Sequence, residues 1–217
     1  MNQLENNTPE TPFLDAIRQP AIIAGAGLIA AAILNAQSTT PPTDLQVLNY
    51  ALTLEHLEAA FYNQGLRRFS STDFGNSTAA LNSGDFLSGN LYAYLSIIRD
   101  HENAHVRSLT AVIRSGSGTP VSPCTYNFGF TTADAFLATA QLLENTGVMA
   151  YDGAVSLINS GVLRTAAASI ATVEARHASY LNVINGGAPA PEAFDTPKTM
   201  AQILAAAGGF IVSCPAT

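Results

Sequence analysis

Residues 100–109 read Asp-His-Glu-Asn-Ala-His-Val-Arg-Ser-Leu, and residues 172–181 read Thr-Val-Glu-Ala-Arg-His-Ala-Ser-Tyr-Leu. Both stretches contain a glutamate followed three residues later by a histidine. On a helix this spacing places the two side chains one turn apart on one face, so both can bind one ion. A single Glu-x-x-His is a weak signal, because exposed polar pairs at this spacing are common. Two copies on separate helices are more specific and predict metal binding.

The other glutamates of the helical region strengthen this prediction. Between residues 44 and 186 the chain has only five glutamates, and they stand among apolar residues rather than on polar helix faces. Two further predicted helices supply Glu55 and Glu144. A glutamate from each of two helices, with Glu-x-x-His from each of two others, is the pattern of di-iron and di-manganese carboxylate bundles. We therefore predict two divalent metal ions, iron or manganese with zinc as an alternative, held by Glu55, Glu102, His105, Glu144, Glu174 and His177.

Two tyrosines repeat the spacing of these glutamates. Tyr62 follows Glu55 by seven residues, and Tyr151 follows Glu144 by seven. Seven residues are two helical turns, so each tyrosine lies on the face of its glutamate. The repeat predicts two helix pairs related by a pseudo-twofold axis around the metal ions. Each tyrosine then packs in the core, hydrogen-bonds a ligating carboxylate, or serves as an electron source near the metal centre.

Three polar residues next to these motifs are expected in outer positions. Glu58 lies three residues after Glu55 and can share its face, either as a ligand or as a hydrogen-bonding neighbour of the ligands. His56 and His101 each point about 100° away from the adjacent glutamate on a helix. We expect both histidines to pack or to form outer hydrogen bonds rather than to bind metal.

The apolar periodicity predicts four long helices beyond residue 43 and very little strand. They are expected at residues 44–66, 87–114, 133–159 and 163–184. The polar stretch 70–84 predicts a loop, and residues 115–129 form a connection rich in Pro, Gly and Ser. About 15 extended residues reach roughly 50 Å, the length of such a bundle. The chain is therefore expected to be all-α, a ferritin-like left-handed four-helix bundle with one long crossover connection.

The composition indicates a folded domain with few charges. Hydrophobic residues make up 47% and charged residues 12% of the 217 residues, which excludes disorder for most of the chain. The net charge is −7, and the nine Lys and Arg residues are scattered. Because no basic face is available to neutralise phosphates, we expect no nucleic-acid partner. Assembly into a homo-oligomer stays open.

An apolar stretch at residues 21–34 precedes the bundle. It is shorter than the roughly 20 residues that span a bilayer as a helix. It fits a secretory signal or a membrane anchor, and alternatively a helix that packs on the domain. We expect a signal or anchor segment with its linker at 1–43, the bundle at 44–187, and a C-terminal tail packed on it at 188–217. We therefore expect the protein to lie outside the cytoplasm. It would contact a membrane only through the N-terminal segment, if that segment is not cleaved.

The two cysteines, Cys124 and Cys214, lie far apart in the sequence. An even pair beside a candidate export signal suggests a disulfide that ties the tail to the crossover connection. The alternative is two unrelated buried thiols. Neither cysteine stands at Cys-x-x-Cys spacing, which argues against a thiolate zinc site.

Five segments of the sequence carry a family resemblance. They are LNYALTLEHLEAAFY (48–62), DHENAHV (100–106), CTYNFGF (124–130), LLENTGVMAYDGA (142–154) and FIVSCP (210–215). Together they resemble the desiccation-related, ferritin-like domain proteins of bacteria, fungi and plants, over about residues 44–214. The resemblance implies a ferritin-like bundle, an exported protein and an association with stress. It also implies the ferritin-like ligand pattern on the same six residues, but no particular reaction.

Three functions follow from these patterns. The first is a redox enzyme whose dinuclear iron or manganese centre, bridged by Glu102 and Glu174, handles oxygen or peroxide. The second is a structural or desiccation-protective module in which the metal only stabilises the bundle. The third is iron storage, which the charge-poor helices and the apolar tail argue against. We favour the redox function.

Overall fold

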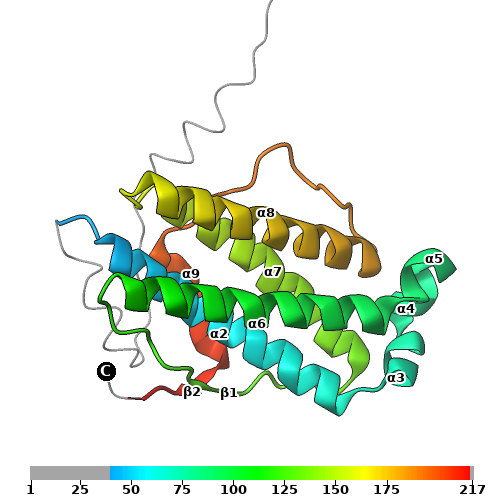
Figure 1. Ribbon diagram of the computed structural model, residues 1–217. Coiled ribbons are helices and arrows are strands. Elements are labelled where there is room, and N and C mark those ends of the chain that lie inside the picture. The colour runs from blue at the N-terminus through cyan, green and yellow to red at the C-terminus, as the bar shows by residue number, and fades with distance from the viewer. Residues whose placement is uncertain (1–39, 216–217) are drawn as a thin grey trace, which may run out of the picture.

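The computed structural model describes residues 40–215, except for the side chains of residues 85 and 86. Its long helices form a four-helix bundle (Figure 1). They are α2 (Asp44–Arg68), α6 (Leu91–Ser115), α7 (Ala133–Val155) and α8 (Gly161–Ile184). Helix α2 packs against α6, and α7 packs against α8, with a single apolar core between the two pairs. The prediction of an all-α bundle is confirmed.

Polar side chains cap the starts of three of the four long helices. Thr43 accepts a hydrogen bond from the Gln46 N–H, and the Gln46 side chain accepts one from the Thr43 N–H, which forms a capping box. Thr132 and Ser160 cap α7 and α8 by accepting a hydrogen bond from the N–H three residues ahead. These caps satisfy backbone N–H groups at the starts of α2, α7 and α8, whereas the Asn90 side chain makes no such bond at the start of α6.

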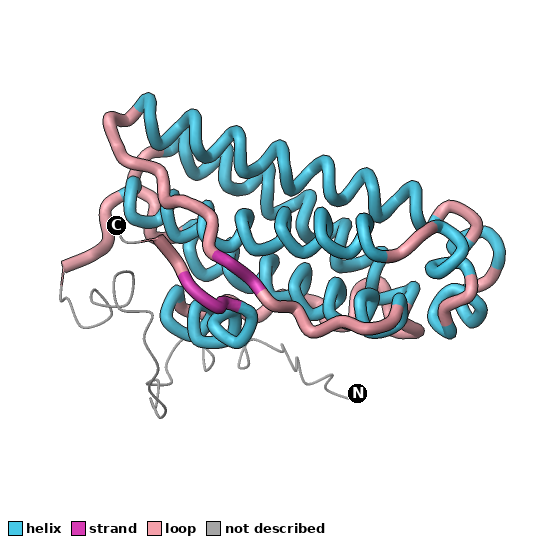
Figure 2. Tube along the Cα trace, turned by 90° about the horizontal axis from the view of Figure 1, so that it is seen from below, coloured by secondary structure: helices cyan, strands magenta, loops and turns pink. Residues whose placement is uncertain are grey.

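The connection from α6 to α7 runs along the bundle from one end to the other (Figure 2). It is fastened to α2 on its way. The Asn49 side chain donates to the Thr119 carbonyl at 3.1 Å and accepts from the Val121 N–H at 2.8 Å. The His56 ring lies 3.2 Å from the Val121 carbonyl. The expected long crossover is therefore present, and its contacts hold it against the first helix.

The prediction of a loop at residues 70–84 is wrong. Two short helices, α3 (Ser71–Gly75) and α4 (Thr78–Ser83), occupy this stretch, and α5 (Asp85–Ser88) follows. Ser70 and Ser77 cap α3 and α4, so the serines that favoured a loop in the sequence start helices instead. Phe74 gives these turns an apolar anchor, because its side chain is fully buried. They connect α2 to α6 along the chain and cover one end of the bundle, with contacts to α6, α7 and α8 (Figure 1).

The C-terminal segment packs across the bundle and the crossover. Helix α9 (Met200–Ala207) contacts α7, and the 3-10 helix η2 (Gly208–Phe210) follows it. Strand β2 (Ile211–Ser213) then pairs antiparallel with β1 (Thr125–Tyr126) of the crossover. The sequence did not predict this small sheet, because two- and three-residue strands carry too short a pattern. The expected disulfide between Cys124 and Cys214 joins the same two segments.

The signal or anchor segment with its linker was expected at 1–43, and residues 1–39 of it, with the apolar stretch 21–34, lie outside the described residues. Within residues 40–215, no helix combines the length and apolar character needed to span a membrane.

Candidate metal centre

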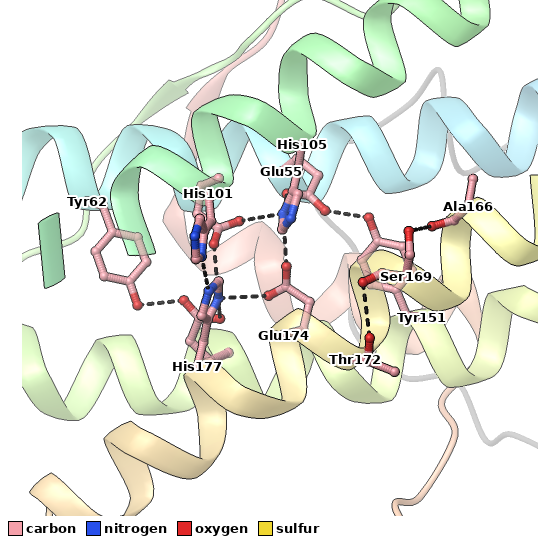
Figure 3. A network of polar contacts seen from close by, with 12 residues as sticks. Glu55, Tyr62, His101, His105, Tyr151, Ala166, Ser169, Thr172, Glu174 and His177 are labelled. Carbon is pink, nitrogen blue, oxygen red and sulfur yellow. Dashed lines mark hydrogen bonds and ion pairs between the residues drawn. The ribbon is translucent and has the colours of Figure 1, made fainter. Parts of the chain in front are cut away.

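The four long helices bring six polar side chains together in the middle of the core (Figure 3). The side chains of all four glutamates are fully buried, whereas His105 and His177 keep 12% and 6% of their side-chain surface exposed. Helices α2 and α7 contribute one glutamate each, and α6 and α8 contribute one Glu-x-x-His each. The members are the six residues expected from the sequence: Glu55, Glu102, His105, Glu144, Glu174 and His177.

These side chains form two groups of four that share two members. In each group one atom of every residue lies within 4.8 Å of the others. The first group, called here the Glu55 half, contains Glu55, Glu102, His105 and Glu174. The second, called the Glu144 half, contains Glu102, Glu144, Glu174 and His177. Such sets of carboxylate oxygens and an imidazole nitrogen can each hold one divalent ion.

The shared glutamates direct one oxygen into each half. Glu102 places Oε2 3.3 Å from His105 Nδ1 and Oε1 3.1 Å from His177 Nδ1. Glu174 places Oε1 3.1 Å from His105 Nδ1 and Oε2 3.7 Å from His177 Nδ1. A carboxylate oriented in this way can bridge two cations.

The other two glutamates each belong to one half and are held by a tyrosine. Glu55 Oε2 lies 3.2 Å from His105 Nδ1, and Glu144 Oε2 lies 3.1 Å from His177 Nδ1. The second oxygen of Glu55 accepts a hydrogen bond from Tyr151, and that of Glu144 accepts one from Tyr62 at 2.5 Å. The hydrogen bond to a carboxylate was one of the expected roles for the tyrosines. Each tyrosine, however, bonds the glutamate of the other helix rather than its own.

The clustered glutamates make both halves favourable places for a positive charge, on a histidine or on a bound cation. Each histidine directs Nδ1 at three carboxylate oxygens, and a single N–H cannot donate well to all three. Burial alone lowers the pKa of His105 and His177, but the surrounding glutamates outweigh it and raise the pKa of both to about 12. Burial and the neighbouring carboxylates raise the pKa of Glu55 and Glu144 well above the usual range.

Three buried carboxylate oxygens provide a direct test of whether a metal fits. Glu102 Oε1 and both oxygens of Glu174 accept no hydrogen bond from any described residue. Although burial opposes it, the two histidines lower the pKa of Glu174 to about 2, which favours its charged form. A buried carboxylate whose oxygens lack well-formed hydrogen bonds is costly, and a divalent cation in each half would compensate its charge. The donors are oxygen and imidazole nitrogen, a set that fits iron, manganese or zinc.

Glu58 is a fifth buried carboxyl group beside the two halves and belongs to neither group of four. The repeat pairs it with Gly147, since these residues follow Glu55 and Glu144 by three positions. A Cβ atom on residue 147 would lie 3.1 Å from Glu58 Oε1 and 3.5 Å from Glu174 Oε2. Gly147 therefore leaves the space that the Glu58 carboxyl group fills. Burial and the nearby carboxylates, Glu174 foremost, raise the pKa of Glu58 well above its usual range.

The other two histidines make outer contacts. His56 faces the crossover, as described above. His101 Nδ1 lies 2.9 Å from His177 Nε2, and the two rings stack with centroids 5.2 Å apart (Figure 3). Because His101 is exposed, it connects the far edge of the His177 ring to the surface. The sequence favoured packing or outer hydrogen bonds for both, but gave no sign that His101 meets α8, because spacing within one helix does not specify partners on another.

Comparison with known proteins agrees with this architecture. A family model described as a ferritin-like domain matches residues 43–186, a span that contains the four long helices and all six residues of the two halves. The protein rds1 of Schizosaccharomyces pombe is 29% identical over 178 residues, which cover 80% of this chain and 40% of that protein. This chain thus spans less than half the length of that relative. The chain belongs to the family of ferritin-like domain proteins.

Proposed function

We propose that this protein binds two divalent metal ions, iron or manganese, and uses them in redox chemistry on dioxygen or peroxide. The observation that carries the proposal is the shared position of Glu102 and Glu174, each of which directs one oxygen at each histidine. The Glu55 half and the Glu144 half would hold one ion each, with Glu102 and Glu174 serving both, which accounts for all six side chains. Four carboxylates and two neutral imidazoles also balance the charge of two divalent ions.

The number of donor atoms favours a reactive centre over a purely structural one. Each half offers four protein donor atoms, because Tyr62 and Tyr151 occupy the second oxygens of the terminal glutamates. Iron and manganese with oxygen ligands commonly take six. Positions therefore remain for water, dioxygen or peroxide. Bound iron or manganese would supply the change of oxidation state that such chemistry requires.

The protein's own residues would perform three tasks around the ions. Glu102 and Glu174 would hold the two ions at a fixed separation, and the two tyrosines would hold the terminal carboxylates in place. Burial among apolar side chains would keep bulk water away. His101, bonded to the far nitrogen of His177, would orient that ring toward the Glu144 half.

The cellular setting is part of the proposal. The disulfide between Cys124 and Cys214 supports an oxidising, extracytoplasmic compartment, because such bonds rarely persist in a reducing cytosol. We infer that the protein acts outside the cytoplasm, in a stress response such as desiccation. The partners in this account are the metal ions and dioxygen or peroxide, with association into homo-oligomers as a further option.

The test is metal analysis of the purified full chain, followed by two activity assays on the loaded protein. One follows dioxygen consumption, and the other follows the conversion of two hydrogen peroxide into two water and one dioxygen. We expect about two iron or manganese ions per chain and activity in at least one assay. Protein stripped by a chelator is the control. Two bound ions with no activity in either assay would instead support a structural or protective module.

A further inference from the structure

The two tyrosines that bond the terminal glutamates have very different surroundings. Tyr62 is enclosed by aromatic rings: the ring centroid of Phe61 lies 5.2 Å away and that of Phe136 lies 5.9 Å away. Phe61 and Phe136 also stack on each other at 4.4 Å, and both are fully buried. This end of the core is therefore filled.

Tyr151 occupies the position in α7 that Tyr62 occupies in α2, but small and aliphatic side chains surround it. They line a cavity of about 80 Å³. All four long helices contribute to its walls, through residues such as Ala51, Leu109, Ala154 and Ala167. Its outer lining includes Ser108 on α6 with Ala166 and Ser169 on α8, which are exposed. The cavity therefore opens to solvent between α6 and α8. Its lining also includes the buried Tyr151, whose hydroxyl donates to Glu55, so the cavity adjoins the Glu55 half. Figure 3 shows Tyr151 beside Glu55.

The cavity offers water few partners. The Tyr151 hydroxyl is bonded to Glu55, and the Ser169 hydroxyl is bonded to the Ala166 carbonyl at 2.6 Å. The remaining interior lining is aliphatic, apart from Ser108 at the exposed rim. A buried water needs two to four polar partners, and apolar cavities stay dry and take up nonpolar atoms such as xenon.

We propose that this cavity, called here the Tyr151 chamber, admits dioxygen to the Glu55 half. The inference rests on the proposed function and narrows it, because it selects dioxygen over peroxide. A cavity of about 80 Å³ is large enough for a diatomic molecule, and its lining is mainly aliphatic. Dioxygen is small and nonpolar and loses no hydrogen bonds on entry. Hydrogen peroxide would lose its hydrogen bonds to water and find few partners in the chamber, whose polar atoms are the hydroxyls of Tyr151, Ser169 and the rim residue Ser108.

The first part of the test uses xenon as the probe and does not depend on metal. Crystals of the full chain are placed under xenon pressure, and the chamber is inspected for a heavy atom. We expect xenon beside Tyr151 and Ala154 in the wild-type protein. Ordered water in the chamber, with no xenon, would overturn the inference whatever the metal content.

The second part compares two adjacent alanines on α8. Ala167 is buried and lines the chamber, whereas Ala168 is exposed and does not. We expect Ala167→Leu to exclude xenon and to slow dioxygen consumption several-fold at unchanged metal content, with Ala168→Leu equal to wild type. Circular dichroism checks that both variants fold, and Ala154→Val serves as a milder filling variant.

The outcomes separate this inference from the proposed function. Absence of bound metal would refute the proposed function, while xenon density alone would still show that the chamber admits nonpolar atoms. Loaded protein that converts peroxide but consumes no dioxygen would overturn the inference and leave the proposed function in place. Unchanged dioxygen consumption in a folded, xenon-free Ala167→Leu protein would also overturn it.

Discussion

The hydroxyl of Tyr62 on α2 donates a hydrogen bond of 2.5 Å to Glu144 on α7. The reciprocal bond runs from Tyr151 on α7 to Glu55 on α2. The two helices that carry no Glu-x-x-His are thus tied to each other on both sides of the centre. Each bond occupies one oxygen of a terminal glutamate and leaves the other directed at a histidine.

This relationship predicts the effect of Tyr62→Phe. The ring can keep its contacts with Phe61 and Phe136, but the Glu144 carboxylate loses the donor that orients it. We expect the Glu144 half to bind its ion about tenfold more weakly, a typical cost of losing a hydrogen bond to a metal ligand. The Glu55 half should be unaffected. Competition with a chelator of known affinity measures the two binding constants.

A matched control is Tyr180→Phe, because the Tyr180 hydroxyl bonds the Leu87 carbonyl at 3.4 Å and touches neither half. It should bind both ions as the wild-type protein does. If Tyr62→Phe and Tyr180→Phe bind metal equally well, the tyrosine hydroxyls do not position the terminal glutamates.

The four long helices could be predicted from the sequence, because apolar spacing within a single helix indicates each of them. The grouping of the six side chains was predicted from the repeated Glu-x-x-His together with one buried glutamate on each of the other two helices. The cross-bundle bonds of Tyr62 and Tyr151 could not be predicted, because they depend on how far α2 is shifted along α7. The same holds for the contact of His101 with His177. The role of Gly147 could not be predicted either. Nothing in the sequence of α7 indicates that Glu58 on α2 fills the space beside this glycine.

The buried environment of Glu58 predicts that Glu58→Gln increases the free energy of unfolding, and that the increase depends on pH. Its pKa is raised in the folded chain, so above about pH 4.3 the unfolded chain releases a proton that the folded chain retains. The stability of the wild-type protein relative to the variant should therefore fall as pH rises. Near pH 7 we therefore expect Glu58→Gln to be the more stable of the two proteins, and its advantage in the free energy of unfolding to shrink toward pH 5.

Urea unfolding between pH 5 and 8, with a chelator present, measures this difference. Glu192→Gln in the exposed tail is the control and should leave the free energy of unfolding unchanged. A Glu58→Gln protein that is less stable than wild type near pH 7 would show that the charged carboxylate is needed there.

The disulfide predicts a large contribution to stability. It joins cysteines 90 positions apart and links β2 to the crossover beside β1. In the chain-entropy model a loop of this length stabilises by about 4.6 kcal/mol. The double variant Cys124→Ser with Cys214→Ser should lose up to about that free energy of unfolding in urea titrations. Reduced wild-type protein should behave like the variant, and equal stability of the oxidised wild type and the variant would contradict the prediction.

Metal stoichiometry in two single-histidine variants tests the central claim most directly. The wild-type chain should hold two ions, and His105→Ala and His177→Ala should each hold one, because each histidine belongs to one half only. His56→Ala, which removes a ring that faces the crossover, should keep both ions. Wild-type occupancy in both His105→Ala and His177→Ala, or a wild-type chain that binds no metal, would contradict the two-ion account.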